Sequence, residues 1–195
     1  SRPRKSCQGT IAVVAGDAMA WARPAFDDSQ WTTRPMPGRW EKGGLPGSGQ
    51  MAWYRLTLEL PDGTSIHHLA VRLGEVMGAY ELYVGGRLLG GVGKLPPLGE
   101  LDYDRQRVYP IPADAVGEDG RLSLALRVWG GGDALASAWR VGPYGGRFLL
   151  GEYRDLLVEG LVGEVPALLV CTLFIGFGLY HLYLYRRNPQ LSPLL

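Results

Sequence analysis

The stretch VPALLVCTLFIGFGLYHLYLY, residues Val165–Tyr185, runs for 21 residues without a formal charge. A helix of that length, at about 1.5 Å per residue, matches the roughly 30 Å hydrocarbon core of a bilayer. Pro166 would fall in its first turn, where a missing N–H costs little. The alternative is a buried helix of a soluble domain, but such helices seldom run this long without a charged face. We therefore predict a membrane-spanning helix.

The two flanks of this stretch differ in charge. Arg186 and Arg187 follow it, whereas Glu159 and Glu164 precede it. Cationic loops stay on the cytoplasmic side of a membrane, so residues 186–195 are predicted to be cytoplasmic and the first 160 or so residues to lie outside. The bilayer is thus one expected partner and a second copy of the chain, packed through the membrane helices, is another. His181 within the span either contacts such a helix or is tolerated near the interface.

Composition limits the class of the part before the span. About 160 residues suffice for one domain, and a net charge of +1 with scattered basic residues gives no footprint for nucleic acid. The two cysteines, Cys7 and Cys171, cannot form a disulfide framework inside that domain, because Cys171 lies in the span. No apolar signal segment opens the chain, and the sequence looks cut at both ends.

Short segments of alternating polarity fill the region before the span. In Trp53–Leu60 and in Arg121–Trp129 every second residue is apolar, which is typical of half-buried strands. Gly85-Gly86 lies between two such segments and predicts a tight hairpin. Further strands are expected at 10–15, 69–73, 78–84, 107–111 and 147–151. The fold class is therefore mainly β, an antiparallel β-sandwich or jelly roll.

The spacing of the apolar residues changes near the end of this domain. Leu150, Tyr153, Leu157 and Leu161 recur at spacings of three and four, which indicates a short amphipathic helix. The predicted organisation is a domain over 9–151, a connector helix over 152–164, the span over 165–185 and the start of a cytoplasmic segment from 186. The connector would either transmit a tilt or rotation or act only as a spacer.

Strand alternation also gives a hypothesis for a binding surface. If the leucines of these strands face the core, an aromatic and arginine-bearing set faces outward, where rings can stack on sugars and guanidinium groups can hold hydroxyls or carboxylates. The alternative is a plain solvated face. The outward set is Trp53, Arg55, Arg72, Glu81, Tyr83, Arg127 and Trp129. Trp40 in the loop 35–49 and Tyr103 in the loop 93–104 are further candidates, although a loop aromatic often just plugs one end of a sandwich.

Motifs for catalysis or for a cofactor are missing from the sequence. It has no phosphate-binding loop, no Gly-x-Ser-x-Gly elbow and no HExxH motif. His67 and His68 would point to opposite faces of a strand, so no metal site is expected. Carboxylates such as Glu81 and Asp102 could serve glycoside hydrolysis only as a correctly spaced pair. We expect a non-catalytic chain without metal or cofactor.

An ordered series of motifs resembles the sugar-binding jelly-roll domain of family 2 glycoside hydrolases, which belongs to the galactose-binding-like superfamily. The series is DDSQW (27–31), PGRW (37–40), WYR (53–55), YELYVGGRLLGGVG (80–93) and LSLALRVW (122–129). The resemblance covers residues 9–141 and implies an accessory module, because the catalytic carboxylates of that family reside in a separate barrel. The loops 35–49 and 93–104 match no motif of the family, so the ligand stays open.

A second resemblance concerns the end of the span. FGLYHLYLYRR (177–187) is similar to the end of the first membrane helix in bacterial seven-transmembrane receptors with diverse intracellular signalling modules. It implies an extracytoplasmic sensor in the cytoplasmic membrane of a bacterium, exposed to the periplasm, that binds a small ligand such as a carbohydrate. The output module, a histidine kinase, diguanylate cyclase or protein phosphatase, would lie outside this chain. The alternatives are a membrane-tethered carbohydrate-binding or adhesion module and an accessory domain of a glycosidase.

Overall fold

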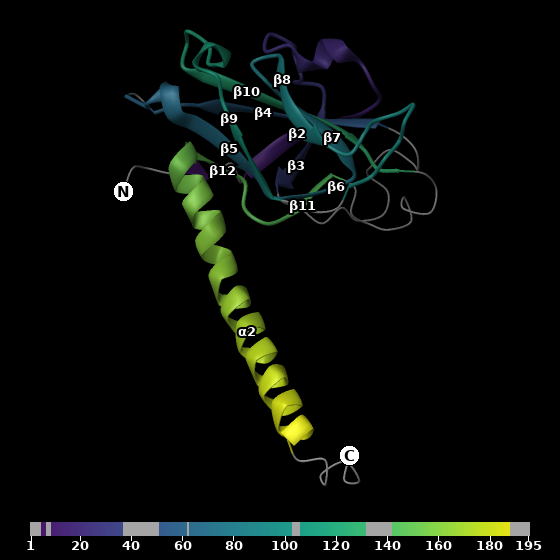
Figure 1. Ribbon diagram of the computed structural model, residues 1–195. Coiled ribbons are helices and arrows are strands. Elements are labelled where there is room, and N and C mark those ends of the chain that lie inside the picture. The colour runs from purple at the N-terminus through teal and green to yellow at the C-terminus, as the bar shows by residue number, and fades with distance from the viewer. Residues whose placement is uncertain are drawn as a thin grey trace. The chain divides into compact units, whose positions relative to one another are not determined.

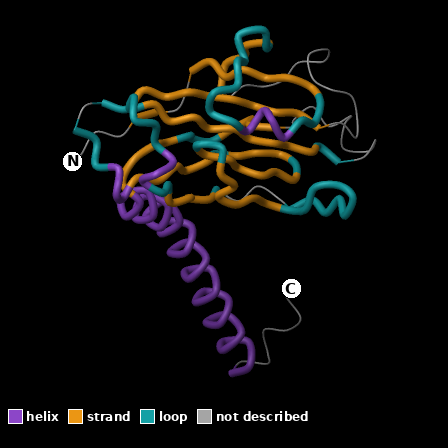
Figure 2. The backbone as a smooth tube through the Cα atoms, turned by 90° about the horizontal axis from the view of Figure 1, so that it is seen from above, coloured by secondary structure: helices purple, strands orange, loops and turns teal. Residues whose placement is uncertain are grey.

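The computed structural model describes residues 5–6, 9–36, 51–61, 63–102, 106–131 and 142–187. The chain divides into two compact units, Ser1–Leu156 and Leu157–Leu195. The first unit is built from antiparallel strands, which confirms the predicted mainly β class (Figure 1). In Figure 2 the strands are orange, and the described loops, in teal, join them.

The larger sheet has six strands in the order β3-β2-β4-β10-β7-β8. Their bounds are β3 Thr32–Met36, β2 Gly9–Ala15, β4 Met51–Glu59, β10 Arg121–Trp129, β7 Ala79–Val84 and β8 Arg87–Val92. The expected strands at 10–15, 53–60, 78–84 and 121–129 are confirmed within two residues. Strand β3 extends into the loop predicted from Pro35, because an edge strand tolerates a proline that donates no hydrogen bond.

A second sheet has four strands in the order β1-β12-β5-β9, and a two-stranded sheet pairs β11 with β6. Their bounds are β1 Lys5–Ser6, β12 Leu149–Glu152, β5 Leu69–Leu73, β9 Arg107–Pro110, β11 Gly142–Gly145 and β6 Glu75–Met77. Short 3-10 helices lie at η1 Met19–Ala22, η2 Ile66–His68 and η3 Ala113–Ala115. His67 and His68 thus belong to a 3-10 helix that directly precedes β5.

The main core lies between the two larger sheets and follows the predicted alternation. Leu58, Leu73, Leu82 and Leu126 are all buried there. The hydroxyls of Tyr80 on β7 and Tyr109 on β9 lie 3.1 Å apart and so link the two sheets across the core. Burial raises the pKa of both tyrosines, which therefore stay protonated.

The hairpin between β7 and β8 turns at Gly85 and Gly86, as predicted. Their φ angles are 57° and 81°, values that suit glycine in a primed two-residue turn. A Cβ on Gly85 would also come within 2.5 Å of the Ala115 carbonyl oxygen, so both conformation and space require glycine here.

The outer face of the six-stranded sheet is covered by residues 16–31, which we call the strap. Trp21 and Trp31 of the strap pack with Trp53 and Tyr83 of the sheet in a second, smaller core. The indoles of Trp21 and Trp53 meet edge to face, with centroids 6.2 Å apart. The strap ends in a turn at DDSQW (27–31), where the Asp27 carboxylate accepts a hydrogen bond from the Ser29 N–H at 3.0 Å.

Helix α2 runs unbroken from Tyr153 to Arg187 and follows β12 without a loop. The connector and the span expected as two helices are thus one, and Pro166 is interior instead of lying in a first turn. The first turn of α2 is anchored by Leu156, which is fully buried on Ala70 and Leu149 of the four-stranded sheet.

Helix α2 is long and exposes most of its apolar side chains. Its 35 residues are apolar enough to cross a bilayer, and none of its most apolar window is buried inside the protein. The Thr172 hydroxyl donates to the Leu168 carbonyl oxygen at 2.8 Å, so this polar group is satisfied within the helix. At its end, Arg187 donates to the Tyr183 hydroxyl at 2.7 Å, a pairing suited to the interface of a membrane.

Candidate functional site

The register of the six-stranded sheet lines up polar and aromatic side chains on its outer face. Arg127 on β10 pairs with Trp53 on β4 and, on its other side, with Glu81 on β7. Glu81 in turn pairs with Gly91 on β8. Since paired residues project to the same face, Trp53, Arg127 and Glu81 form one row that ends at a position without a side chain.

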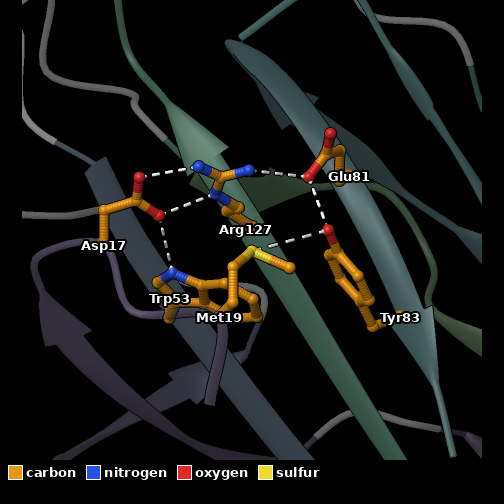
Figure 3. A network of polar contacts seen from close by, with 6 residues as sticks. All are labelled: Asp17, Met19, Trp53, Glu81, Tyr83 and Arg127. Atoms are coloured by element: carbon orange, nitrogen blue, oxygen red, sulfur yellow. Dashed lines mark hydrogen bonds and ion pairs between the residues drawn. The ribbon is translucent and has the colours of Figure 1, made fainter. Parts of the chain in front are cut away.

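Arg127 joins this row to the strap (Figure 3). Its Nε and Nη2 donate to the two carboxylate oxygens of Asp17 at 2.7 and 2.6 Å, and its Nη1 donates to Oε2 of Glu81 at 3.0 Å. The indole N–H of Trp53 donates to Asp17 at 3.4 Å. The two parallel hydrogen bonds from Arg127 to Asp17 are the strong arrangement of an arginine with a carboxylate.

Tyr83 completes the group, which we call the Arg127 cluster: Asp17, Trp53, Glu81, Tyr83 and Arg127. Its hydroxyl donates to Oε2 of Glu81 at 2.7 Å and lies 4.0 Å from the sulfur of Met19, which is a weak contact. Burial, together with the hydrogen bond to Glu81, raises the pKa of Tyr83 to about 12. The cluster therefore holds a neutral phenol, one guanidinium and two carboxylates near neutral pH.

The cluster is partly open to solvent. The side chains of Arg127, Glu81 and Asp17 are 18%, 29% and 39% exposed. Within the described residues, Arg127 uses three of its five N–H donors and Glu81 uses only Oε2. Two N–H donors of Arg127 and Oε1 of Glu81 thus have no hydrogen-bond partner among the described residues.

The Asp17–Arg127 pair makes the free energy of unfolding depend on pH in the acidic range. Hydrogen bonds from Arg127 hold the pKa of Asp17 below its ordinary value of 3.8. Because the folded pKa is depressed, the stabilisation is complete above the unfolded pKa and is lost as pH falls through the folded one. Solvent screens this pair, so the contribution is about 0.5–1 kcal/mol. We expect Asp17→Asn to lower the free energy of unfolding by that amount at pH 7, and the difference from wild type to shrink below about pH 4.

Urea unfolding followed by tryptophan fluorescence measures this difference, because all six tryptophans precede the span. Asp119→Asn is the matched control, since Asp119 is 62% exposed beside Arg121 and its pair is expected to contribute little. If Asp17→Asn lowered the free energy of unfolding by the same amount at pH 3 and pH 7, the Asp17–Arg127 pair would not be the cause of the lowered pKa of Asp17.

Arg55 has a different role from the one predicted for it. Its side chain is 2% exposed, and its Nε donates to Oδ2 of Asp28 in the strap at 2.9 Å. Its Nη1 and Nη2 donate to four backbone carbonyls of the strap, and the Phe26 ring lies 5.7 Å from its guanidinium carbon. These carbonyls belong to Trp21, Arg23 at 3.1 Å, Pro24 at 3.5 Å and Phe26 at 3.4 Å. All five donors hold the strap on the sheet.

The predicted binding surface therefore needs correction. Trp53, Arg55 and Tyr83 project from the outward face as expected, but they are 0%, 2% and 7% exposed because the strap covers them. Arg72 lies on β5 of the other sheet, is 6% exposed and shares its face with Ala70, on which Leu156 packs. Strand alternation specifies a face, but it does not specify which sheet a strand joins or what lies over it.

The remaining predicted residues are placed as follows. Glu81, Arg127 and Trp129 are partly exposed on the outer face of the six-stranded sheet. Trp129 lies under the loop after β8, where a Cβ on Gly99 would come within 2.9 Å of its indole ring. Trp40 and Tyr103 lie outside the described residues, so their roles stay predictions.

Two aspartates of the strap were missed as site residues. Asp17 lies 110 positions from Arg127, and Asp28 lies 27 positions from Arg55, so no local spacing links either pair. The available signal was Gly16-Asp17 directly after a strand, which places a carboxylate at the end of the sheet. Asp28 gave no such signal, because Asp is common in turns for purely local reasons.

The interior of the sandwich offers no competing polar site among the described residues. A cavity of about 30 Å³ lies between the sheets, lined by apolar side chains including Ile11, Leu82 and Phe148. Such a lining gives hydroxyl groups no partners. In the described part of the chain, no group of three or more His, Cys, Asp or Glu side chains is arranged to hold a metal ion.

Comparisons with known proteins identify the fold and no more. No protein-family model matches the chain, and no curated protein matches it. Among solved structures, it is similar to Bacteroides uniformis beta-glucuronidase 2 covalently bound to cyclophellitol-6-carboxylate aziridine, with 24% identity, a TM-score of 0.59, and coverage of 77% of this chain and 18% of that one.

Two further structures agree with this result. A member of glycosyl hydrolase family 2 from Bacteroides cellulosilyticus is 17% identical, with a TM-score of 0.58 and coverage of 75% of this chain and 20% of that one. Bifidobacterium dentium beta-glucuronidase complexed with coumarin-3-O-glucuronide is 14% identical, with a TM-score of 0.51 and coverage of 77% and 30%. The chain therefore spans less than a third of each neighbour, and its first unit has the fold of a β domain found in family 2 glycosidases.

Proposed function

We propose that this chain is the sugar-binding, extracytoplasmic domain of a bacterial membrane sensor, held in the cytoplasmic membrane by α2. The observation that carries the proposal is the combination of a β domain shared with glycosidases and an apolar helix that follows it without a loop. The ordered motifs that resemble the sugar-binding domain of family 2 glycoside hydrolases support it. A receptor role accounts for a sugar-binding fold attached to a membrane.

The Arg127 cluster is the proposed ligand surface. Among the described residues, two guanidinium N–H donors of Arg127 and the Oε1 acceptor of Glu81 have no partner within the chain. Neighbouring hydroxyls of a sugar can accept from such donors and donate to such an acceptor at the same time. Trp129, next but one to Arg127 on β10, supplies a partly exposed ring beside them.

The cluster does not have the properties of a hydrolytic site, and we propose that this chain is not itself an enzyme. A glycosidase needs one carboxyl group with a raised pKa as its acid. Arg127 contacts both Asp17 and Glu81, and it lowers the pKa of Asp17 instead of raising it. Both carboxylates are therefore suited to accepting hydrogen bonds, which is a binding role.

The membrane part of the proposal concerns orientation and output. Arg186 and Arg187 at the end of α2 support an orientation with the C-terminal end in the cytoplasm and the β domain outside. A helix that is anchored in the domain through Leu156 and continues into the bilayer can carry a displacement across it. The signal would reach a cytoplasmic kinase, cyclase or phosphatase module, and a second copy of the chain would pack against α2.

Thermal unfolding of the full chain in lipid nanodiscs tests the binding role. A sugar present at 100 times its dissociation constant adds about 2.7 kcal/mol to the folded state, which raises the melting temperature by about 5–11 °C. Mono- and oligosaccharides, sugar acids and small anions form the panel. We expect a dose-dependent rise for at least one sugar that Glu81→Gln reduces by half or more.

Two controls complete this experiment. Arg121→Ala removes an arginine of the same strand that is 58% exposed and pairs with Glu59, and it should leave the ligand-induced rise unchanged. Hydrogen exchange at residues 153–164 distinguishes a sensor from a tether, because only a sensor changes the protection of α2 when the sugar binds. No rise for any member of the panel would overturn the sugar-binding role.

A further inference from the structure

Asp17 occupies the edge of Arg127 that a carboxylate ligand would use. Its two oxygens accept from Nε and Nη2 at 2.7 and 2.6 Å, which is the two-pronged geometry by which arginine recognises free carboxylates. The strap therefore supplies, from within the chain, the chemical group that distinguishes a sugar acid from a neutral sugar.

The net charge of the cluster also disfavours a carboxylate ligand. Arg127 contributes +1, whereas Asp17 and Glu81 contribute −1 each, so the three groups sum to −1. An incoming carboxylate would meet Glu81 at close range and would have to displace Asp17 from Arg127. Like charges in such proximity disfavour binding, whereas a neutral molecule meets no such barrier.

We propose that Asp17 determines ligand specificity by filling the carboxylate-binding edge of Arg127, so that the cluster accepts neutral polyhydroxy ligands and excludes sugar acids. This inference rests on the proposed sugar-binding function and narrows it to one ligand class. The groups left for the ligand are the remaining N–H donors of Arg127 and Oε1 of Glu81, and both match hydroxyls.

The inference differs from what the structural neighbours alone would suggest. Two of the similar structures are beta-glucuronidases, and one of them is complexed with a glucuronide, which carries a carboxylate. In this chain, the arginine that could pair with that carboxylate is already paired with Asp17. Similarity of fold does not specify the ligand of this chain, whereas the cluster itself predicts a neutral sugar.

Asp17→Asn tests the proposal, because it removes the negative charge and keeps the size of the side chain. Binding of methyl glucoside and of glucuronate to the full chain in nanodiscs is titrated at pH 7 by tryptophan fluorescence. We expect wild type to bind the neutral sugar at least about tenfold more tightly than the uronate. In Asp17→Asn this preference should fall by about tenfold through a gain in uronate affinity, while the affinity for the neutral sugar changes less than about threefold.

Asp119→Asn makes the same charge change at a 62% exposed site beside Arg121 and should behave as wild type. If Asp17→Asn loses the native fluorescence spectrum, Asp17→Ser replaces it. A uronate affinity of wild type equal to that for the neutral sugar, or no gain in a folded Asp17 variant, would overturn the inference while leaving sugar binding intact. Failure of every protein to bind either sugar would overturn the proposed function together with it.

Discussion

Replacing Arg55 with leucine is expected to lower the free energy of unfolding of the β domain by about 3–5 kcal/mol. Arg55 is 2% exposed and donates all of its hydrogen bonds to the strap. Its loss leaves the Asp28 carboxylate and four strap carbonyls facing an apolar side chain. Urea unfolding of the full chain in detergent micelles, followed by tryptophan fluorescence, measures the change. Arg55→Lys should recover only part of it, because an ammonium cannot reproduce the planar fork.

Arg121→Leu is the matched control for this prediction. Arg121 is an arginine of the same sheet, on β10, and pairs with Glu59 of β4, but its side chain is 58% exposed. We expect its replacement to change stability by less than about 1 kcal/mol. Equal effects at Arg55 and Arg121 would show that the strap does not depend on the buried arginine.

Ile175→Arg is expected to impair membrane insertion of α2, with a cost of about 2.5–3.5 kcal/mol. Ile175 lies midway along the apolar stretch, is 64% exposed and has no buried partner that could accept a charge. Such a cost reduces the inserted fraction by roughly a hundredfold when insertion is otherwise balanced. Extraction of cell membranes at alkaline pH, which releases proteins that do not span the bilayer, measures the inserted fraction.

Val158→Arg provides the comparison on the same helix. Val158 is 50% exposed and precedes the apolar stretch by seven positions, so an arginine there can remain in water. We expect the inserted fraction of Val158→Arg to equal that of wild type. If both variants remained in the membrane fraction to the same extent, the helix would not span the bilayer at Ile175.

The main core and the strands around it were predictable from sequence because their pattern is local. Alternation in Arg121–Trp129 specifies which side chains face inward, and Leu124 and Leu126 are buried accordingly. The glycine pair at Gly85 specified the hairpin for an equally local reason, since both turn positions need a positive φ.

The cluster itself was only half predictable. Glu81 and Arg127 were chosen because they alternate with core residues, but Asp17 was not, because sheet pairing and the path of the strap decide which distant carboxylate meets an arginine. The same strap buries Trp53, although the alternation of its strand alone predicted an exposed position. No local sequence pattern shows that a distant segment covers a sheet. Strand alternation therefore cannot distinguish an outward residue that is exposed for binding from one that is buried under such a segment.

The separation of two cores by one sheet also has an evolutionary consequence. The main core is enclosed between the sheets, whereas the strap packs on the opposite side of β4, β7 and β10 through its own small cluster. Substitutions at strap positions such as Asp17 or Met19 can therefore alter the chemistry presented to a ligand without disturbing the main core between the sheets. Related chains could diversify in what they recognise by changing this one segment while inheriting the same sandwich and the same helix.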